Sequence, residues 1–330
     1  MKRIQKANGY FLIILIYEIL GALILGALFK ALRISDIRVM LLINHTVIFI
    51  IPGIIYLILS KRPIKEILRL NKLNKKSLGI IVLISFLIQP VMSFLSLIST
   101  FFFNNDVAEM INEISSTNYA SLLLLVAVLP AISEELTIRG IILSGYDKKN
   151  KYIASIVTGL FFGIFHLNPQ QFLYTFALGF ILALVVRITN SIFASVLMHF
   201  IINGTSVTLT KVLYLIQNSS IIEGVQENQE YNMINTPIFD KLIGAFYWAA
   251  IALAFGIIVY SLIKKLEKVN PKLKNEYQTN NNVNYNVQGN YNLGAYRTEY
   301  LELEEQEEKI VNIPFVLSIL VFITYMIIFT

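Results

Sequence analysis

The sequence predicts an all-α fold, a polytopic transmembrane helical bundle with about eight spans plus a ninth at the C-terminus. Composition is the first reason, because 56% of the 330 residues are hydrophobic, only 15% are charged, and the mean hydropathy is +0.66. Soluble domains carry about 25% charged residues. Spacing is the second reason, because the apolar residues fall into runs of roughly 20, the length that a helix needs to cross a ~30 Å hydrocarbon core.

The predicted spans follow these apolar runs in chain order. The first begins after the basic segment Met1 to Lys6 and is longer than the apolar part of a signal peptide, so we expect a retained helix. The predicted spans are 10–30, 39–59, 79–103, 119–145, 152–167, 170–188, 191–215, 242–263 and 313–329.

Basic residues gather in alternate connections between the spans. They precede span one, separate spans two and three and spans four and five, end span six and follow span eight, whereas the opposite connections are mostly acidic. The first outer loop is the exception, with Lys30, Arg33 and Arg38. The positive-inside rule therefore predicts a cytoplasmic N-terminus in an integral protein of the cell membrane. The net charge of +6 reports on this topology, so we expect the lipid bilayer and no nucleic acid as a partner.

Ionisable residues inside spans are costly, about 2.5–3.5 kcal/mol for a central Asp, Lys or Arg, and usually mark function. The fourth span holds Glu134, Glu135 and Arg139. Glu135 and Arg139 are four residues apart on one helical face and are expected to pair. Glu134 lies ~100° around the helix from Glu135, so its carboxylate is not expected to join the pair with Arg139. Pro130 removes a backbone hydrogen bond just before this pair and is expected to loosen the helix.

Two further spans carry polar side chains at a similar predicted depth. Phe162 and His166 lie in the fifth span, and His199 and Asn203, again four residues apart, lie in the seventh. Such a set suits hydrolysis by water, with a glutamate taking a proton and imidazole or amide groups stabilising an oxyanion.

A metal site is the alternative use of the same groups. Glu134, His166 and His199 could hold Zn²⁺, although the HExxH motif is absent, and the sequence leaves open whether the cofactor is zinc or none. The absence of cysteine excludes disulfides and thiolate ligands.

These residues resemble the motifs EExxxR, FxxxH and HxxxN of the CPBP family, the CAAX protease and bacteriocin-processing (Abi) intramembrane proteases, and the chain looks Rce1-like. The motifs start at Glu134, Phe162 and His199 and keep the family's order over residues 119–205. The resemblance implies that Glu134 is catalytic with His166 as its partner in activating water. It further implies that His199 and Asn203 stabilise the oxyanion, that Glu135 and Arg139 are structural or position substrate, and that Phe162 packs the site.

The predicted function is therefore an intramembrane endopeptidase that cuts a membrane-associated, prenylated or leader peptide substrate. Two alternatives stay open, a non-enzymatic membrane scaffold in immunity or the cell envelope, and a proton-coupled transporter. Glu18 and His45 match no motif, and we expect Glu18 to snorkel or face the bundle and His45 to pack.

The predicted organisation separates a catalytic core from flanking membrane segments. Residues 275–296 are rich in Asn and Tyr, a composition that favours a disordered cytoplasmic linker. The predicted units are 1–118 (N-terminal spans and basic loop), 119–215 (catalytic core), 216–264 (outer loop and eighth span), 265–312 (Asn-rich linker) and 313–330 (C-terminal span).

Overall fold

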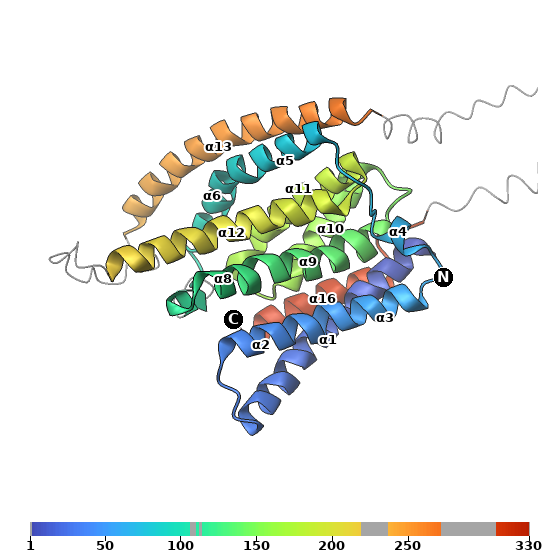
Figure 1. Cartoon of the computed structure of the whole chain (residues 1–330), viewed down its shortest axis with the longest axis horizontal. Helices are drawn as coiled ribbons and strands as arrows, with labels where there is room; N and C mark the ends of the chain where they lie inside the picture. The colour runs from blue at the N-terminus through green and yellow to red at the C-terminus, as the bar shows by residue number, and fades with distance from the viewer. Residues whose placement is uncertain (1, 106–109, 112–113, 219–236, 272–307, 330) are drawn as a thin grey trace, which may run out of the picture.

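The computed structural model describes residues 2–105, 110–111, 114–218, 237–271 and 308–329, and these ranges hold helices and no strand (Figure 1). Within the described ranges, seven helical spans are long and apolar enough to cross a membrane, and two shorter apolar helices accompany them. The prediction of an all-α, polytopic membrane protein is confirmed. The predicted linker 275–296 and most of the 216–241 loop lie outside the described residues.

The helices coincide with the predicted spans, and several spans are built from consecutive segments. The second, third and fourth spans are each divided, and the π-helical segments are labelled η1, η3 and η4. In chain order the elements are α1 (Arg3–Ala31), α2 (Ile37–Asn44), η1 (His45–Ile50), α3 (Ile51–Leu59), α4 (Ile64–Ile67), α5 (Lys75–Leu87), α6 (Gln89–Ser99), η2 (Ile114–Ser116), α8 (Tyr119–Leu122), η3 (Leu123–Val128), α9 (Leu129–Glu135), η4 (Leu136–Ile142), α10 (Lys151–Phe165), α11 (Pro169–Thr189), α12 (Ile192–Gln217), α13 (Ile238–Val269) and α16 (Ile313–Phe329).

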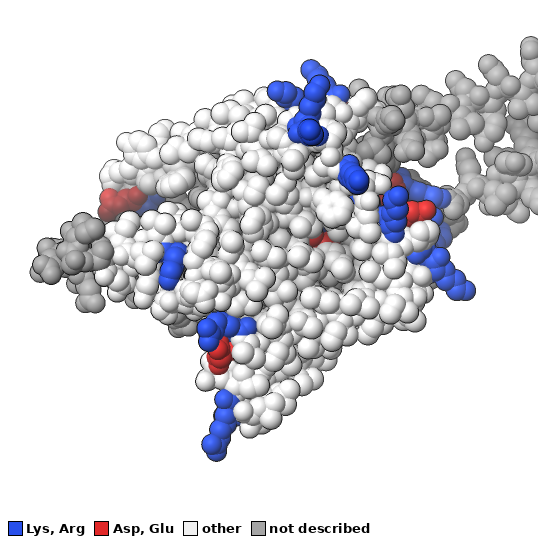
Figure 2. All heavy atoms as spheres, in the orientation of Figure 1, with Lys and Arg blue, Asp and Glu red and all other residues white. Residues whose placement is uncertain are grey.

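Contacts between connections bring the basic loops to one end of the bundle. Asn71 donates to the carbonyl of Asn190 at 2.7 Å, and Lys151 pairs with Glu267 at 2.6 Å. These contacts join the loop before α5 to the α11–α12 turn, and the start of α10 to the end of α13. Figure 2 shows charged side chains toward the ends of the molecule, with an almost uncharged surface between them. The compartment that this basic end faces stays a prediction.

Helices α10 and α11 approach closely because glycines line their contact. Gly159 and Gly163 form a small-xxx-small pair on α10; Gly179 of α11 faces Gly159, and Phe172 of α11 faces Gly163. A Cβ atom on Gly159 would lie 2.7 Å from the backbone nitrogen of Phe180. Small residues of this kind let two backbones pack tightly inside a membrane, where apolar burial gives no net drive for association. This contact sets the position of the α10 residues one turn away, including Phe162.

Replacing Gly159 by alanine is expected to destabilise the bundle by about 1–3 kcal/mol, because the added Cβ has no space against the α11 backbone. Unfolding of the purified protein in detergent, titrated with a denaturing detergent, measures the loss. Gly79→Ala on α5 is the matched control, since nothing lies within 4 Å of its added Cβ. That variant should be unchanged or slightly more stable, because alanine favours a helix. Equal effects of the two substitutions would contradict the close approach of α10 and α11.

The C-terminal helix α16 packs against the rest of the bundle. Its Phe315 ring lies 5.6 Å from Phe161 of α10, and its Phe322 ring lies 5.4 Å from Phe172 of α11. Asn8 of α1 also donates to the carbonyl of Ile310, just before α16, at 3.0 Å. The ninth span therefore supports the helix pair that carries the second motif.

Candidate active site

The fourth span positions the first motif on a short α-helical segment between two π-helical ones. Segment α9 carries Glu134 and Glu135, with η3 before it and η4 after it. Pro130, in the first turn of α9, has no N–H to donate to the carbonyl of Val126, as a regular α-helix would require. That carbonyl accepts a hydrogen bond from Asn203 Nδ2 on α12 instead, at 3.1 Å. The helix is thus loosened at Pro130 as expected, and the carbonyl that lacks the proline N–H accepts from Asn203 of the third motif.

Glu135 and Arg139 form a buried ion pair, as the four-residue spacing predicts. Arg139 Nη1 lies 2.9 Å from Glu135 Oε1, and neither side chain is exposed. Arg139 also donates to the carbonyl of Gly179 at 3.3 Å, and its guanidinium lies 4.2 Å from the centre of the Phe162 ring. The ion pair therefore links the fourth span to α10 and α11.

His199 lies between the two glutamates. Its Nδ1 is 3.0 Å from Glu135 Oε1, and its Nε2 is 3.9 Å from Glu134 Oε2. When ionised, a carboxylate only accepts hydrogen bonds, so Nδ1 carries a proton and donates. The separation from Glu134 is too long for a direct hydrogen bond. Hence His199 is fixed through Glu135 while its other nitrogen faces Glu134.

His166 ends α10, where its ring orientation is set by the backbone. Its Nδ1 donates to the carbonyl of Phe162 at 2.7 Å, since a carbonyl can only accept. A neutral His166 ring therefore leaves Nε2 as an acceptor. The Phe162 ring makes edge contacts with both imidazoles, with centroids 4.7 Å from His166 and 5.9 Å from His199. Phe162, which is 1% exposed, thus packs the site as the motif resemblance implied.

The structure brings residues of all three motifs together. Around Phe162 lie Arg139, His166 and His199, and the glutamates contact His199. Asn203 follows His199 by one helical turn. The arrangement supports a common site, and the catalytic roles of these residues stay predictions.

The residues do not form a recognisable metal site. Within the described parts of the chain, no group of three His, Asp or Glu side chains is close enough to hold a metal ion. Glu134, His166 and His199 therefore do not fit a zinc ion as they stand.

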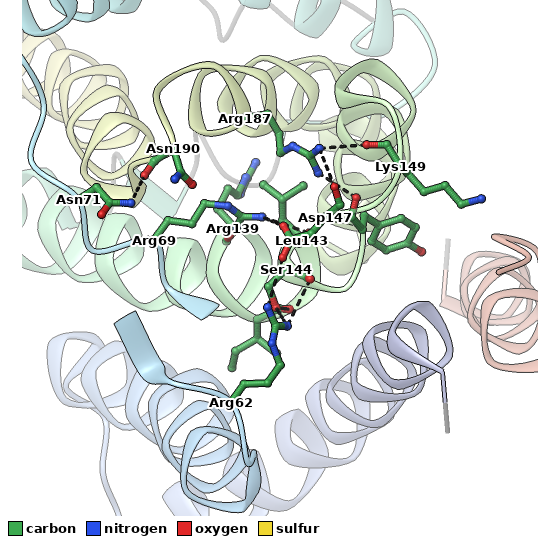
Figure 3. Close-up of polar contacts among 12 residues, drawn as sticks. Arg62, Arg69, Asn71, Arg139, Leu143, Ser144, Asp147, Lys149, Arg187 and Asn190 are labelled. Carbon is green, nitrogen blue, oxygen red and sulfur yellow. Dashed lines mark hydrogen bonds and ion pairs between the residues drawn. The ribbon is translucent and has the colours of Figure 1, made fainter. Parts of the chain in front are cut away.

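Arginines hold the end of the motif span at the basic end of the bundle (Figure 3). Arg69 donates to the carbonyl of Arg139 at 3.0 Å and pairs with Asp147. Arg187 of α11 donates to the carbonyl of Tyr146 at 2.8 Å. The last carbonyls of a helix have no partner within the helix, and basic side chains can satisfy them. These contacts fix where the motif span ends.

Ser133 and His45 were not identified as site residues from the sequence. Ser133 directly precedes the two glutamates, and the ring of His45 lies 3.0 Å from its hydroxyl. Neither residue belongs to a motif, and the only signal was a polar residue within the second apolar span.

The Glu134 and Glu135 carboxylates lie beside the His199 imidazole in the interior of a helical membrane protein, and groups of these kinds suit hydrolysis by water. Residues 116–205 match the family model described as Type II CAAX prenyl endopeptidase Rce1-like. Over this region the chain is similar to the Rce1-like CAAX endopeptidases, which are intramembrane proteases. No curated protein and no solved structure matched the chain.

Replacing Asn203 by leucine is expected to destabilise the protein by about 1–3 kcal/mol, because the Val126 carbonyl loses its donor. Adding Pro130→Ala supplies a backbone N–H at position 130 and should restore part of that stability. Unfolding in detergent of the two single variants and the double variant measures this recovery. If the changes in unfolding free energy of the two single variants simply add in the double variant, the link between Asn203 and Pro130 is contradicted.

Proposed function

We propose that the protein hydrolyses a peptide bond of a membrane-associated substrate, with a prenylated peptide of the CAAX type as the first substrate class, using Glu134 to activate water. The 3.9 Å approach of Glu134 Oε2 to His199 Nε2, inside the matched region, is the observation that carries this proposal. This distance supports the proposal, because Nε2 of His199 becomes a donor when the ring is protonated.

The proton transfers follow from the hydrogen bonds around the site. Water forms a C–O bond with the scissile carbonyl carbon while Glu134 takes one of its protons. Nε2 of His166, whose Nδ1 proton is committed to Phe162, can accept a hydrogen bond from the same water. The carbonyl electron pair moves to oxygen and forms a tetrahedral oxyanion.

The oxyanion needs donors, and the third motif can supply them. One N–H of the Asn203 amide goes to Val126, which leaves the second available. His199 can donate through Nε2 when its ring is protonated, and its Nδ1 is held by Glu135. When the oxyanion collapses, the C=O bond reforms, the C–N bond breaks, and the leaving amine nitrogen takes the proton held by Glu134.

The test compares a farnesylated peptide ending in a CAAX sequence with the same peptide lacking the lipid. Full-length protein in detergent is incubated with each, and the products are identified by mass spectrometry. We expect cleavage after the prenylated cysteine only with the lipidated peptide. Equal cleavage of both peptides would contradict the prenyl substrate class. Cleavage by a Glu134→Gln protein at the wild-type rate would contradict the role of Glu134 as the base.

We further propose that the basic end of the bundle faces the cytoplasm. Because the chain has no native cysteine, single cysteines report directly on exposure. In intact cells, an impermeant maleimide should label Lys30→Cys and leave Lys61→Cys unlabelled until the membrane is opened. The reverse pattern would invert the orientation.

A further inference from the structure

The second span contributes to the site although it carries none of the three motifs. His45 begins the π-helical segment η1, and its Nδ1 lies 3.0 Å from the Ser133 hydroxyl on α9. Ser133 is 1% exposed and directly precedes Glu134. A histidine from the second span is therefore bonded to the residue beside the proposed base.

The direction of this hydrogen bond follows from the bonds around Ser133. The Ser133 hydroxyl donates its single proton to the carbonyl of Leu129 at 2.9 Å. The hydroxyl oxygen must therefore accept from His45, so His45 Nδ1 carries a proton. Both interactions of Ser133 are thus defined, and the His45 ring orientation is fixed by one of them.

Local packing keeps His45 against the motif span. Its ring stacks on Phe49 of the same span, with centroids 5.4 Å apart. Further along this span, Gly53 allows close contact, since a Cβ there would lie 2.5 Å from the Leu136 side chain. The two spans are therefore in direct contact on both sides of Glu134.

Segment α9 is short, and side-chain bonds connect it to other spans. It has seven residues, and π-helical stretches precede and follow it. A π-helical turn changes the rotation of every later residue about the helix axis. Side-chain bonds to two other spans lie on either side of Glu134 in the sequence. Glu135 bonds to His199 on one side, and Ser133 bonds to His45 on another.

We propose that His45 is a positioning residue of the active site, which acts through Ser133 to orient Glu134. This inference rests on the proposed function only for its kinetic consequence. His45 is not proposed to touch substrate, so its loss is expected to lower kcat and leave KM nearly unchanged.

The kinetic test uses variants that separate the bond from the packing. His45→Phe retains an aromatic ring against Phe49 and loses the N–H donor, and Ser133→Ala removes the acceptor. Each should lower kcat by about 10- to 100-fold, the scale of a small misplacement of a reacting group. The double variant should be no slower than the singles, because both remove one bond. His45→Asn, which keeps an N–H donor, should recover part of kcat.

Thr46→Val is the matched control, since the Thr46 hydroxyl bonds only within its own helix, to the Leu42 carbonyl at 2.7 Å. A His45→Phe protein with wild-type kcat would overturn the inference. So would a double variant whose loss equals the product of the two single losses, because independent effects multiply.

A second measurement does not depend on proteolysis. Dicyclohexylcarbodiimide modifies protonated carboxyl groups in apolar surroundings, and mass spectrometry reports the rate at Glu134 in full-length protein. We expect His45→Phe and Ser133→Ala to change this rate by a similar factor, about tenfold, as expected for a redirected carboxyl group. An unchanged rate overturns the inference. If no form cleaves any peptide, the proposed substrate fails while the labelling still decides the role of His45.

Discussion

Replacing Glu134 by glutamine is expected to lower kcat for a cleaved peptide by about 10²- to 10⁴-fold, the contribution typical of a positioned general base. The amide keeps the shape of the side chain but cannot take a proton from water. Because Glu134 makes no direct hydrogen bond to His199 across 3.9 Å, the substitution breaks no strong contact. The thermal unfolding midpoint in detergent should therefore stay close to that of the wild type.

The matched control is Glu267→Gln on α13. Glu267 pairs with Lys151 at the basic end, with its side chain 22% exposed, and such partly exposed pairs contribute about 0–1 kcal/mol. This variant should retain full activity. A Glu134→Gln protein that cleaves at the wild-type rate would exclude Glu134 as the base.

The sequence predicted those features that depend on local spacing. The apolar runs located every described span, and the four-residue interval between Glu135 and Arg139 predicted their ion pair. The motif resemblance also predicted that Phe162 packs against the site. Each of these follows from helix geometry or from a pattern contained within a few turns.

Features that depend on tertiary contacts did not appear in the sequence. The π-helical segments on both sides of α9 leave no periodicity signal, because stretches of six and seven residues are too short for i→i+5 bonding to change the apolar pattern of a span. The bond from His45 to Ser133 joins residues 88 positions apart, and nothing local to either marks it. His45 was expected to pack, and it does stack on Phe49, but it also bonds to the motif span.

The structure also refines the role of the third motif. Asn203 was expected to stabilise an oxyanion, and it donates to the carbonyl of Val126. One amide group can do both, because its nitrogen carries two protons. The two uses can be separated experimentally, because Pro130→Ala should recover the stability lost with Asn203 but not the stabilisation of the oxyanion.

Replacing Arg139 by leucine is expected to cost about 3–5 kcal/mol, the penalty for leaving a buried charge without its partner. The Glu135 carboxylate is fully buried, and one of its oxygens already lacks a hydrogen bond. Unfolding in detergent measures this loss, which should exceed that of any other single substitution considered above.

The double variant Glu135→Leu with Arg139→Leu separates stability from catalysis. Replacing both charges by apolar side chains removes the unpaired charge, so much of the lost stability should return. His199 Nδ1 then loses its carboxylate acceptor, so this contact no longer orients the ring toward Glu134. A stable double variant with low kcat therefore assigns Glu135 a part in positioning His199. A stable and fully active double variant would show that the ion pair serves folding alone.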